Sequence, residues 1–317
     1  MNILGIETSC DETAASVVRD GCQVLSNVVV SSLKEHARYG GVIPEIASRR
    51  QLECINQVVD EALLAANLNL KDIDAVAVTQ SPGLIGSLLV GISFARALSF
   101  AIQKPLIDVN HIEAHLYANF LELPGKAPLR LSLPAVGLVV SGGHTSLYLI
   151  KDFKNYKLLG QTRDDAAGEA FDKVARILDL GYPGGPAIDR LAQKGQQTSL
   201  KFQGANLPDS LDFSFSGVKT AVLYQQQNKT ARTYPREEVA YAFQKSVVDV
   251  LVSKCLLACK KLRVKTILVG GGVAANSELR RELTDQCQKN KITISFPPMA
   301  LCLDNAAMIA GLGYQHI

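Results

Sequence analysis

The sequence predicts an α/β protein built from two domains. With 317 residues, the chain is longer than a typical single domain. Short β-branched or apolar runs alternate along it with longer segments of helical period, which is typical of α/β architecture. A strand–turn–strand pattern near the N-terminus also recurs about one domain later. This recurrence favours two related domains whose turns face a common cleft.

The composition fits a globular protein, with 47% hydrophobic and 20% charged residues. Seven cysteines include no C-x-x-C pair, and no export signal precedes the first strand, so we expect reduced thiols and a cytoplasmic protein. The net charge of +3 does not by itself indicate nucleic-acid binding. Basic runs at 49–50, 260–265 and 280–281 are consistent either with a local basic surface or with solvated helix faces.

Strands and helices are expected in alternation. The runs that predict strands are residues 3–6, 75–79, 106–109, 136–140, 266–269 and 292–296. Helical period predicts helices over residues 44–66, 84–102, 168–178, 236–262 and 276–289. The polar, turn-rich stretch 201–236 is expected to form loops over the second domain.

The segment 84–102 is the most membrane-like part of the chain. It carries Arg96, two glycines and three serines, and it lies between two expected strands. We therefore expect a buried crossover helix and no membrane span.

Both copies of the recurring pattern have small residues in the turn. The first copy turns around Ser9, and the second turns at Ser141, Gly142 and Gly143. Small side chains let phosphate oxygens approach the backbone N–H groups, so such turns can cradle an anion. Two ordinary hairpins would give either pattern alone. The pairing of the two patterns favours the anion cradle.

Two further glycine-rich turns support nucleotide binding. Residues 270–276 follow an expected strand and open a helix, where nucleotides are commonly held, and Asn276 can either cap the helix or bond a ligand. A plain strand-to-helix turn remains the alternative because the G-x-G-x-x-G order is missing. At residues 183–186, we expect Pro186 at the first helical position and Asp189 in the first turn.

The sequence His111-Ile112-Glu113-Ala114-His115 opens an expected helix after Asn110. The two histidines lie about 40° apart on one face and are a plausible metal pair, although such a pair can also be purely structural. Glu113 falls about 200° from either histidine, so the zinc-protease arrangement is excluded. Asp304 is the candidate third ligand, and its alternative role is a helix N-cap.

Taken together, these residues resemble the universal tRNA threonylcarbamoyltransferase family, once labelled O-sialoglycoprotein endopeptidase. The resemblance runs from Gly5 to about Gly313. In chain order its marks are 5–13 (GIETSCDET), 111–115 (HIEAH), 141–145 (SGGHT), 168–173 (GEAFDK), 213–217 (FSFSG) and 270–276 (GGGVAAN). The chain ends 13 residues after Asp304, whereas the family continues somewhat further.

The resemblance implies the fold of the actin, Hsp70 and sugar-kinase (ASKHA) superfamily, with two duplicated domains around a nucleotide cleft. The expected N-terminal domain, residues 1–130 plus 300–317, carries the metal site, and residues 131–299 carry most of the nucleotide pocket. The implied metal ligands are His111, His115 and Asp304. The implied substrate-binding residues are Val139, Val140, Ser141, Gly142, Gly143, Asp172, Gly185, Asp189 and Asn276. Taken alone, Asp172 would also fit a helical ion pair with Arg176 and Asp189 a dipole-stabilised acid.

The implied activity is transfer of a threonylcarbamoyl group from threonylcarbamoyl-AMP to N6 of adenosine 37 in tRNAs that read codons beginning with A. One divalent ion per subunit is expected, with Fe²⁺ favoured and Zn²⁺ the alternative. The implied partners are tRNA, a threonylcarbamoyl-AMP synthase as supplier, a paralogous partner subunit and a small ATPase. An ATPase or small-molecule kinase of the same fold is the main alternative, and a non-catalytic regulatory member is another.

Overall fold

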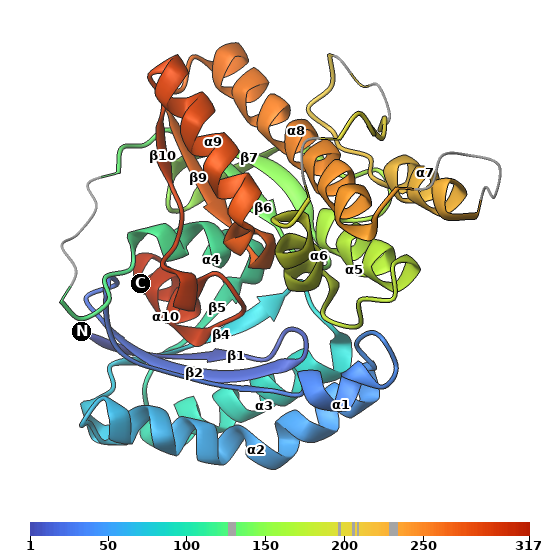
Figure 1. The fold of residues 1–317 in the computed structure, drawn as a ribbon. Coiled ribbons are helices and arrows are strands. Elements are labelled where there is room, and N and C mark those ends of the chain that lie inside the picture. The colour runs from blue at the N-terminus through green and yellow to red at the C-terminus, as the bar shows by residue number, and fades with distance from the viewer. Residues whose placement is uncertain (126–130, 196–197, 205–206, 208, 228–233) are drawn as a thin grey trace. The chain divides into compact units, whose positions relative to one another are not determined.

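The computed structural model describes residues 1–125, 131–195, 198–204, 207, 209–227 and 234–317 (Figure 1). The chain forms two compact units. Unit 1 comprises Met1–Leu131 and Pro297–Ile317, and unit 2 comprises Ser132–Phe296. Each unit contains one mixed sheet with helices packed on it. The predicted α/β class is therefore confirmed.

The sheet of unit 1 has the strand order β3-β2-β1-β4-β5. Its strands are β1 (Asn2–Glu7), β2 (Glu12–Arg19), β3 (Gln23–Ser31), β4 (Ala75–Ser81) and β5 (Leu106–Asn110). The first three form an antiparallel meander, and β1, β4 and β5 run parallel. The carboxyl ends of β1, β4 and β5 therefore meet at one edge of the sheet, where unit 1 carries its candidate site.

Helices cover both faces of this sheet. They are α1 (Leu33–Ala37), α2 (Pro44–Ala65), α3 (Ile85–Ile102), α4 (His111–Tyr117) and α10 (Ala306–Gln315), with short 3-10 turns at Leu70–Asp72, Ala118–Phe120 and Met299–Leu301. Leu4 and Ile6 of β1 join the core shared with α2. Gly5, between them, faces α10. The alternation of side chains along a strand explains why α2 and α10 lie on opposite faces.

The close approach of α10 to β1 depends on Gly5. A Cβ atom there would lie 2.3 Å from the Ala306 carbonyl oxygen and 2.7 Å from the Ala310 nitrogen. We expect Gly5→Ala to lower the free energy of unfolding by about 2–3 kcal/mol, because backbone atoms of α10 must shift. Urea denaturation measures the change. Gly41→Ala is the control, since its Cβ would meet nothing within 4 Å, and equal midpoints for the two variants would contradict the prediction.

Helix α3 corrects one expectation. It is the predicted crossover, joining β4 to β5, but it is not buried. Only Ser87, Gly91 and Ala95 are buried, whereas Ile85 is 78% and Phe100 is 86% exposed. The buried strip of α3 packs closely on the sheet, since a Cβ atom on Gly91 would lie 2.2 Å from Thr8 Oγ1. Hydropathy records how apolar a helix is and not which face has a neighbour.

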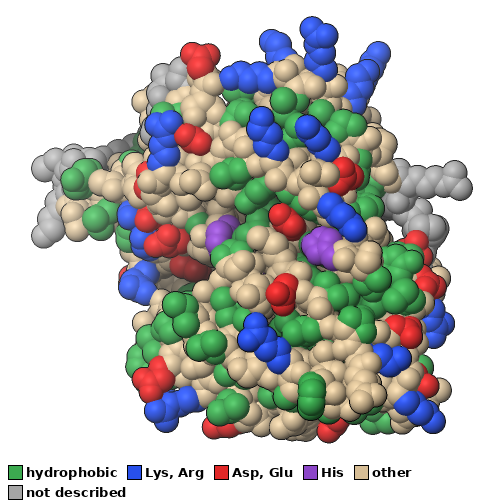
Figure 2. All heavy atoms as spheres, turned by 180° about the vertical axis from the view of Figure 1, so that it is seen from behind, with side chains coloured by type: hydrophobic (Ala, Val, Ile, Leu, Met, Phe, Trp, Pro, Cys, Tyr) green, Lys and Arg blue, Asp and Glu red, His purple; other side chains and the backbone are tan. Residues whose placement is uncertain are grey.

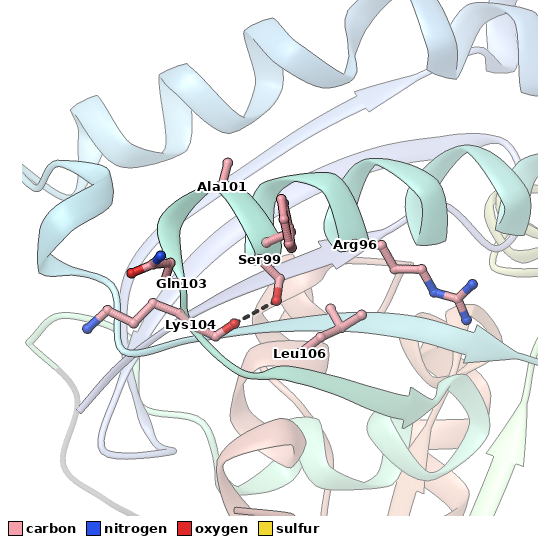
Figure 3. Close-up of a pocket in the computed structure, with 7 residues that line it drawn as sticks. Arg96, Ser99, Ala101, Gln103, Lys104 and Leu106 are labelled. Carbon is pink, nitrogen blue, oxygen red and sulfur yellow. Dashed lines mark hydrogen bonds between the residues drawn. The ribbon is translucent and has the colours of Figure 1, made fainter.

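By length and composition alone, α3 is also the one helix of the described chain that is long and apolar enough to cross a membrane. Its C-terminal end has a shallow groove (Figure 3). There the helix stops at Gln103, which adopts the left-handed conformation, and Ser99 Oγ donates to the Lys104 carbonyl oxygen at 2.6 Å.

The sheet of unit 2 repeats the strand order and directions of unit 1. Its strands are β6 (Ala135–Val140), β7 (Thr145–Asp152), β8 (Asn155–Gln161), β9 (Thr266–Gly270) and β10 (Thr293–Ser295). The order β8-β7-β6-β9-β10 matches β3-β2-β1-β4-β5, with an antiparallel meander followed by parallel strands. Its helices are α5 (Ala167–Ile177), α6 (Gly184–Ala192), α7 (Ser216–Gln227), α8 (Arg236–Leu262) and α9 (Ser277–Asn290), with a 3-10 turn at Gly272–Ala275.

Three local expectations for unit 2 were wrong. The stretch expected to be loops contains α7, and part of that stretch lies outside the described residues. Helix α6 begins at Gly184 rather than Pro186, so Asp189 lies beyond its first turn. Strand β10 is two residues shorter than the expected 292–296. The start of α7 is held by Asp164, whose carboxylate accepts from the Phe215 nitrogen at 2.7 Å. This long-range contact leaves no local sequence pattern.

Candidate functional site

Helix α4 starts immediately after β5 and presents His111 and His115 on one face. Asn110 makes this abrupt start possible, because its Oδ1 accepts from the nitrogens of Ile112 at 2.9 Å and Glu113 at 3.1 Å. Both histidines are buried, and their ring centroids lie 4.6 Å apart. One helical turn therefore sets the spacing of the pair.

Asp304 reaches the same place from the far end of the chain. The N-cap of α10 is Asn305 and not Asp304, so the alternative role of Asp304 as the cap is wrong. Asp304 Oδ1 lies 3.1 Å from His115 Nε2 and 3.7 Å from His111 Nε2. One possible ligand atom from each of the three residues lies within 4.8 Å of the other two. The structure thus brings the three predicted metal ligands together.

The hydrogen bonding of His115 fits a metal ligand. The residue is 1% exposed, yet neither ring nitrogen makes a hydrogen bond. Nε2 is close to Asp304, but the contact lacks hydrogen-bond alignment. Leaving a buried polar group unsatisfied costs about 1–3 kcal/mol. A cation held between the histidines and the carboxylate would supply the missing partner of Nε2, the nitrogen nearest Asp304.

Glu7 also belongs to this site, although no local sequence pattern predicted a role for it. It ends β1 and is fully buried. Its Oε2 lies 2.9 Å from His111 Nδ1 and accepts from Thr79 Oγ1 at 2.6 Å. Burial opposes ionisation, but the pKa of Glu7 is lowered overall because His111 attracts and hydrogen-bonds the carboxylate. The sequence feature that could have indicated this role is a charged residue at the end of an otherwise largely apolar strand.

The turn between β1 and β2 places a second unusual acid near the site. Burial, followed by repulsion from Asp304 and Asp11, raises the pKa of Glu12 to about 9. The turn is held by Gln51 of α2, whose Nε2 donates to the carbonyl oxygens of Cys10 at 2.9 Å and Glu12 at 3.0 Å. Burial and the neighbouring carboxylates therefore favour the neutral form of the Glu12 carboxyl.

In unit 2, the turn after β6 is open above its glycines. Val139 and Val140 are buried in β6, and the chain reverses through Ser141, Gly142 and Gly143. The Ser141 nitrogen donates to the His144 carbonyl oxygen at 2.8 Å, which closes the turn. A Cβ on Gly142 or Gly143 would meet nothing within 4 Å. Ligand atoms can therefore approach this backbone directly.

The glycine run after β9 lies against the end of β6. Gly271 has φ +91°, and a Cβ on it would lie 2.4 Å from the Val140 carbonyl oxygen, so only glycine fits. Asn276 follows and caps α9 by accepting from the Leu279 nitrogen at 2.9 Å, while its Nδ2 donates to Gln244. Of the two predicted roles of Asn276, capping the helix or bonding a ligand, the structure shows the capping role.

The two predicted acidic residues of the pocket are both tied to helix starts. Asp172 Oδ1 accepts from the Gly184 nitrogen at 2.7 Å. Burial raises the pKa of Asp172, and the Gly184 and Gly185 amides oppose the shift. Asp189 accepts from Ser277 Oγ at 2.7 Å, at the start of α9. The structure therefore joins Asp172 with Gly185, and Asp189 with the residue that follows Asn276.

Comparison with known proteins identifies the family. A family model described as tRNA N6-adenosine threonylcarbamoyltransferase matches residues 23–311. The protein of that name from Clostridium botulinum is 53% identical over 99% of this chain and 92% of its own length. The chain belongs to this transferase family. A Staphylococcus aureus relative of the same name is 50% identical over 99% of this chain and 91% of its own length.

Solved structures of proteins with other names share the fold. Component A of the Acidaminococcus fermentans (R)-2-hydroxyglutaryl-CoA dehydratase has a TM-score of 0.58 at 14% identity, covering 100% of this chain and 98% of that chain. HypF from T. kodakarensis has a TM-score of 0.64 at 13% identity, covering 99% of this chain and 48% of that chain. At identities this low, the likeness shows a shared fold only. The activity must be argued from the site residues.

A charged cluster joins Lys173, in the mark 168–173 of the threonylcarbamoyltransferase family, to Lys219, which lies two residues after the mark 213–217. Lys173 Nζ lies 2.7 Å from Asp165 Oδ1, and Lys219 Nζ lies 2.8 Å from Asp165 Oδ2. Burial opposes ionisation of Asp165, but these two lysines lower its pKa overall. The cluster therefore fixes α7 to the segment that precedes α5.

We expect Asp165→Asn to lower the free energy of unfolding by about 1–3 kcal/mol at pH 7. A carboxyl whose folded pKa is depressed stabilises the fold above its unfolded pKa, and this contribution is lost as pH falls through the folded value. The difference in the free energy of unfolding between variant and wild type should therefore be largest at pH 6–7 and should decrease below about pH 4. Urea denaturation across this range measures it, and a difference independent of pH would contradict the ionic origin. Asp209→Asn is the control.

Proposed function

We propose that this chain transfers the threonylcarbamoyl group from threonylcarbamoyl-AMP to N6 of adenosine 37 in tRNAs that read codons beginning with A. Family membership at 53% identity over the chain supports the reaction. The observation that carries the proposal is the convergence of His111, His115 and Asp304 within 4.8 Å of one another. The kinase or ATPase alternative has no use for this group.

One divalent ion would be held by His111, His115 and Asp304. Two imidazoles and one carboxylate suit Fe²⁺ or Zn²⁺, and we propose Fe²⁺. When bound, the ion supplies Lewis acidity that stabilises negative charge on a substrate oxygen. Glu7 holds His111 by its Nδ1 atom, which leaves Nε2 directed toward Asp304.

The adenylate would be bound by the loops of unit 2. The open amides at Ser141, Gly142 and Gly143 suit phosphate oxygens, with Val139 and Val140 lining the approach. The remaining proposed nucleotide contacts are Asp172, Gly185, Asp189 and Asn276. Because Asp172 and Asp189 already bond the starts of α6 and α9, nucleotide contact by these acids would be coupled to the placement of both helices.

The reaction joins two bound molecules without a covalent enzyme intermediate. The adenosine N6 amine attacks the carbamoyl carbon, a C–N bond forms, the C–O bond to phosphate breaks, and AMP leaves with the bonding electrons. The amine also loses a proton, which water or a phosphate oxygen of the leaving AMP takes up. The chain therefore contributes chiefly alignment of the reactants and stabilisation of charge on oxygen.

The matching strand orders of the two units support their interpretation as duplicated domains of the ASKHA superfamily. Unit 1 carries the proposed metal residues, and unit 2 carries the proposed nucleotide loops. We also propose a cytoplasmic location. The proposed partners are tRNA, a threonylcarbamoyl-AMP synthase, a paralogous subunit and a small ATPase.

The test supplies labelled threonine, bicarbonate, ATP, unmodified tRNA, the adenylate-forming enzyme and the partner proteins, and then measures label on tRNA. Label that requires this chain and both histidines supports the transferase. A positive control with a known relative validates the assay. If that control succeeds and this chain gives no label but phosphorylates a small alcohol, the kinase alternative replaces the proposal.

A further inference from the structure

A concentration of positive charge lies at one end of unit 2. Residues 259–266 and 286–293 contain six cations and no Asp or Glu. These cations, which we call the basic edge, are Lys260, Lys261, Arg263, Lys265, Lys289 and Lys291. The chain has 33 Lys and Arg against 30 Asp and Glu. Without the basic edge, 27 cations would face 30 acids, so these six residues account for the entire positive excess.

The fold brings the two segments together. Helix α8 leads into β9 and α9 leads into β10, and these strands are parallel neighbours, so both helices end at the same edge of the sheet. The Thr293 nitrogen donates to the Lys265 carbonyl oxygen at 2.8 Å, which joins the two segments directly. Figure 2 shows Lys and Arg side chains gathered at the top of the view, at this end of unit 2.

The six side chains are available to a ligand. All are exposed, and within the described parts of the chain none forms an ion pair with an acid. Lys261 Nζ donates to the Asp209 carbonyl oxygen, a neutral group. Cations in the last turn of a helix also stabilise its dipole, which accounts for Lys260, Lys261 and Lys289. It does not account for the three cations at or beyond the helix caps.

The chemistry of the basic edge fits a phosphate backbone. No large hydrophobic side chain is exposed in either segment, whereas protein interfaces usually have an apolar or aromatic centre. The basic edge lies at the start of β9, and the glycine run follows the end of β9, so the strand's five residues separate them by roughly 17 Å. A folded RNA can span this distance with its target base beside the adenylate bound at the loops and its backbone phosphates at the basic edge.

We propose that the basic edge binds the phosphate backbone of the tRNA substrate and holds it while the target adenosine is modified. The inference rests on the proposed function. Binding through phosphates is insensitive to base sequence and releases counterions, so it contributes affinity and salt dependence. Recognition of the target base remains with the site.

The test compares two variants with equal loss of charge. The first combines Lys260→Gln, Lys265→Gln, Lys289→Gln and Lys291→Gln. The control combines Lys34→Gln, Lys71→Gln, Lys104→Gln and Lys201→Gln, which lie outside the basic edge. Fluorescence anisotropy measures the Kd for unmodified tRNA at several salt concentrations, and the transfer assay with partner proteins measures KM for tRNA.

For the basic-edge variant, Kd and KM should rise about 10-fold or more, and the slope of log Kd against log salt should fall by about 3. The control should match the wild type. If the basic-edge variant equals the control in Kd and in the salt dependence of Kd, the inference is overturned. Transfer by the wild type in the same experiment would still support the proposed function. Impaired transfer with unchanged tRNA affinity also overturns it and indicates a protein partner there. Absence of transfer by the wild type refutes the proposed function instead.

Discussion

Replacing His115 with alanine is expected to remove the bound metal and the transferase activity together. His115 is one of the three convergent candidate ligands, and its nitrogens make no other hydrogen bond within the described structure. Two remaining ligands hold a divalent ion poorly, so metal content should fall from about one equivalent to near zero and transfer should fall at least about 100-fold. Metal analysis after dialysis and the labelled-threonine assay measure both effects.

The matched control is Glu113→Gln on the same helix. Glu113 lies two residues from either histidine but outside the ligand group, so the control should keep metal and activity. The fold of the His115→Ala variant should survive, because no hydrogen bond is lost, and its urea midpoint checks this point. A correctly folded, metal-free variant with full transfer would refute the proposed role of the ion.

Replacing Glu7 with glutamine is expected to weaken metal binding by about 10–100-fold. The carboxylate accepts a hydrogen bond from Nδ1–H of His111, which orients the ring and makes Nε2 a stronger ligand. A neutral amide keeps the shape but loses the charge that favours this arrangement. Competition of the protein with a chelator for Zn²⁺ measures the affinity, and ¹⁵N NMR of the zinc-loaded protein reports which His111 nitrogen carries the proton.

Glu53→Gln serves as its control, because Glu53 is an exposed acid on α2. Thr79→Val should have a smaller effect than Glu7→Gln, since it removes one hydrogen bond to the carboxylate and leaves the charge in place. If Glu7→Gln binds Zn²⁺ as tightly as the wild type with the same His111 tautomer, the assignment of Glu7 as a positioning residue is wrong.

Periodicity and turn chemistry predicted most of the secondary structure correctly. The strands at the start of each meander and the helices at 44–66 and 236–262 appeared within a residue of the expected bounds, because their hydrophobic periods and ends are local properties. Helix α7 was missed because its start depends on Asp164, about 50 residues away. The exposure of α3 was missed because a helix's own sequence does not state which neighbours cover it.

In the candidate site, too, some features follow from the local sequence and others depend on the tertiary structure. The spacing of His111 and His115 and the openness of the 141–143 turn follow from residue types along a short stretch of chain. The burial of Glu7 against His111, and the contacts that tie Asp172 and Asp189 to helix starts, join residues that are 104, 12 and 88 positions apart. Such contacts require the complete fold.

By itself, the sequence determined the α/β class, the histidine pair, the glycine-rich turns and the resemblance to the transferase family, since these reside in local period, spacing and order. Only the tertiary structure decided that Asp304 meets the histidines and that six cations from two helix ends form one basic edge. The reason is physical: hydrogen bonding and packing between distant segments set those distances, and no short stretch of sequence encodes them.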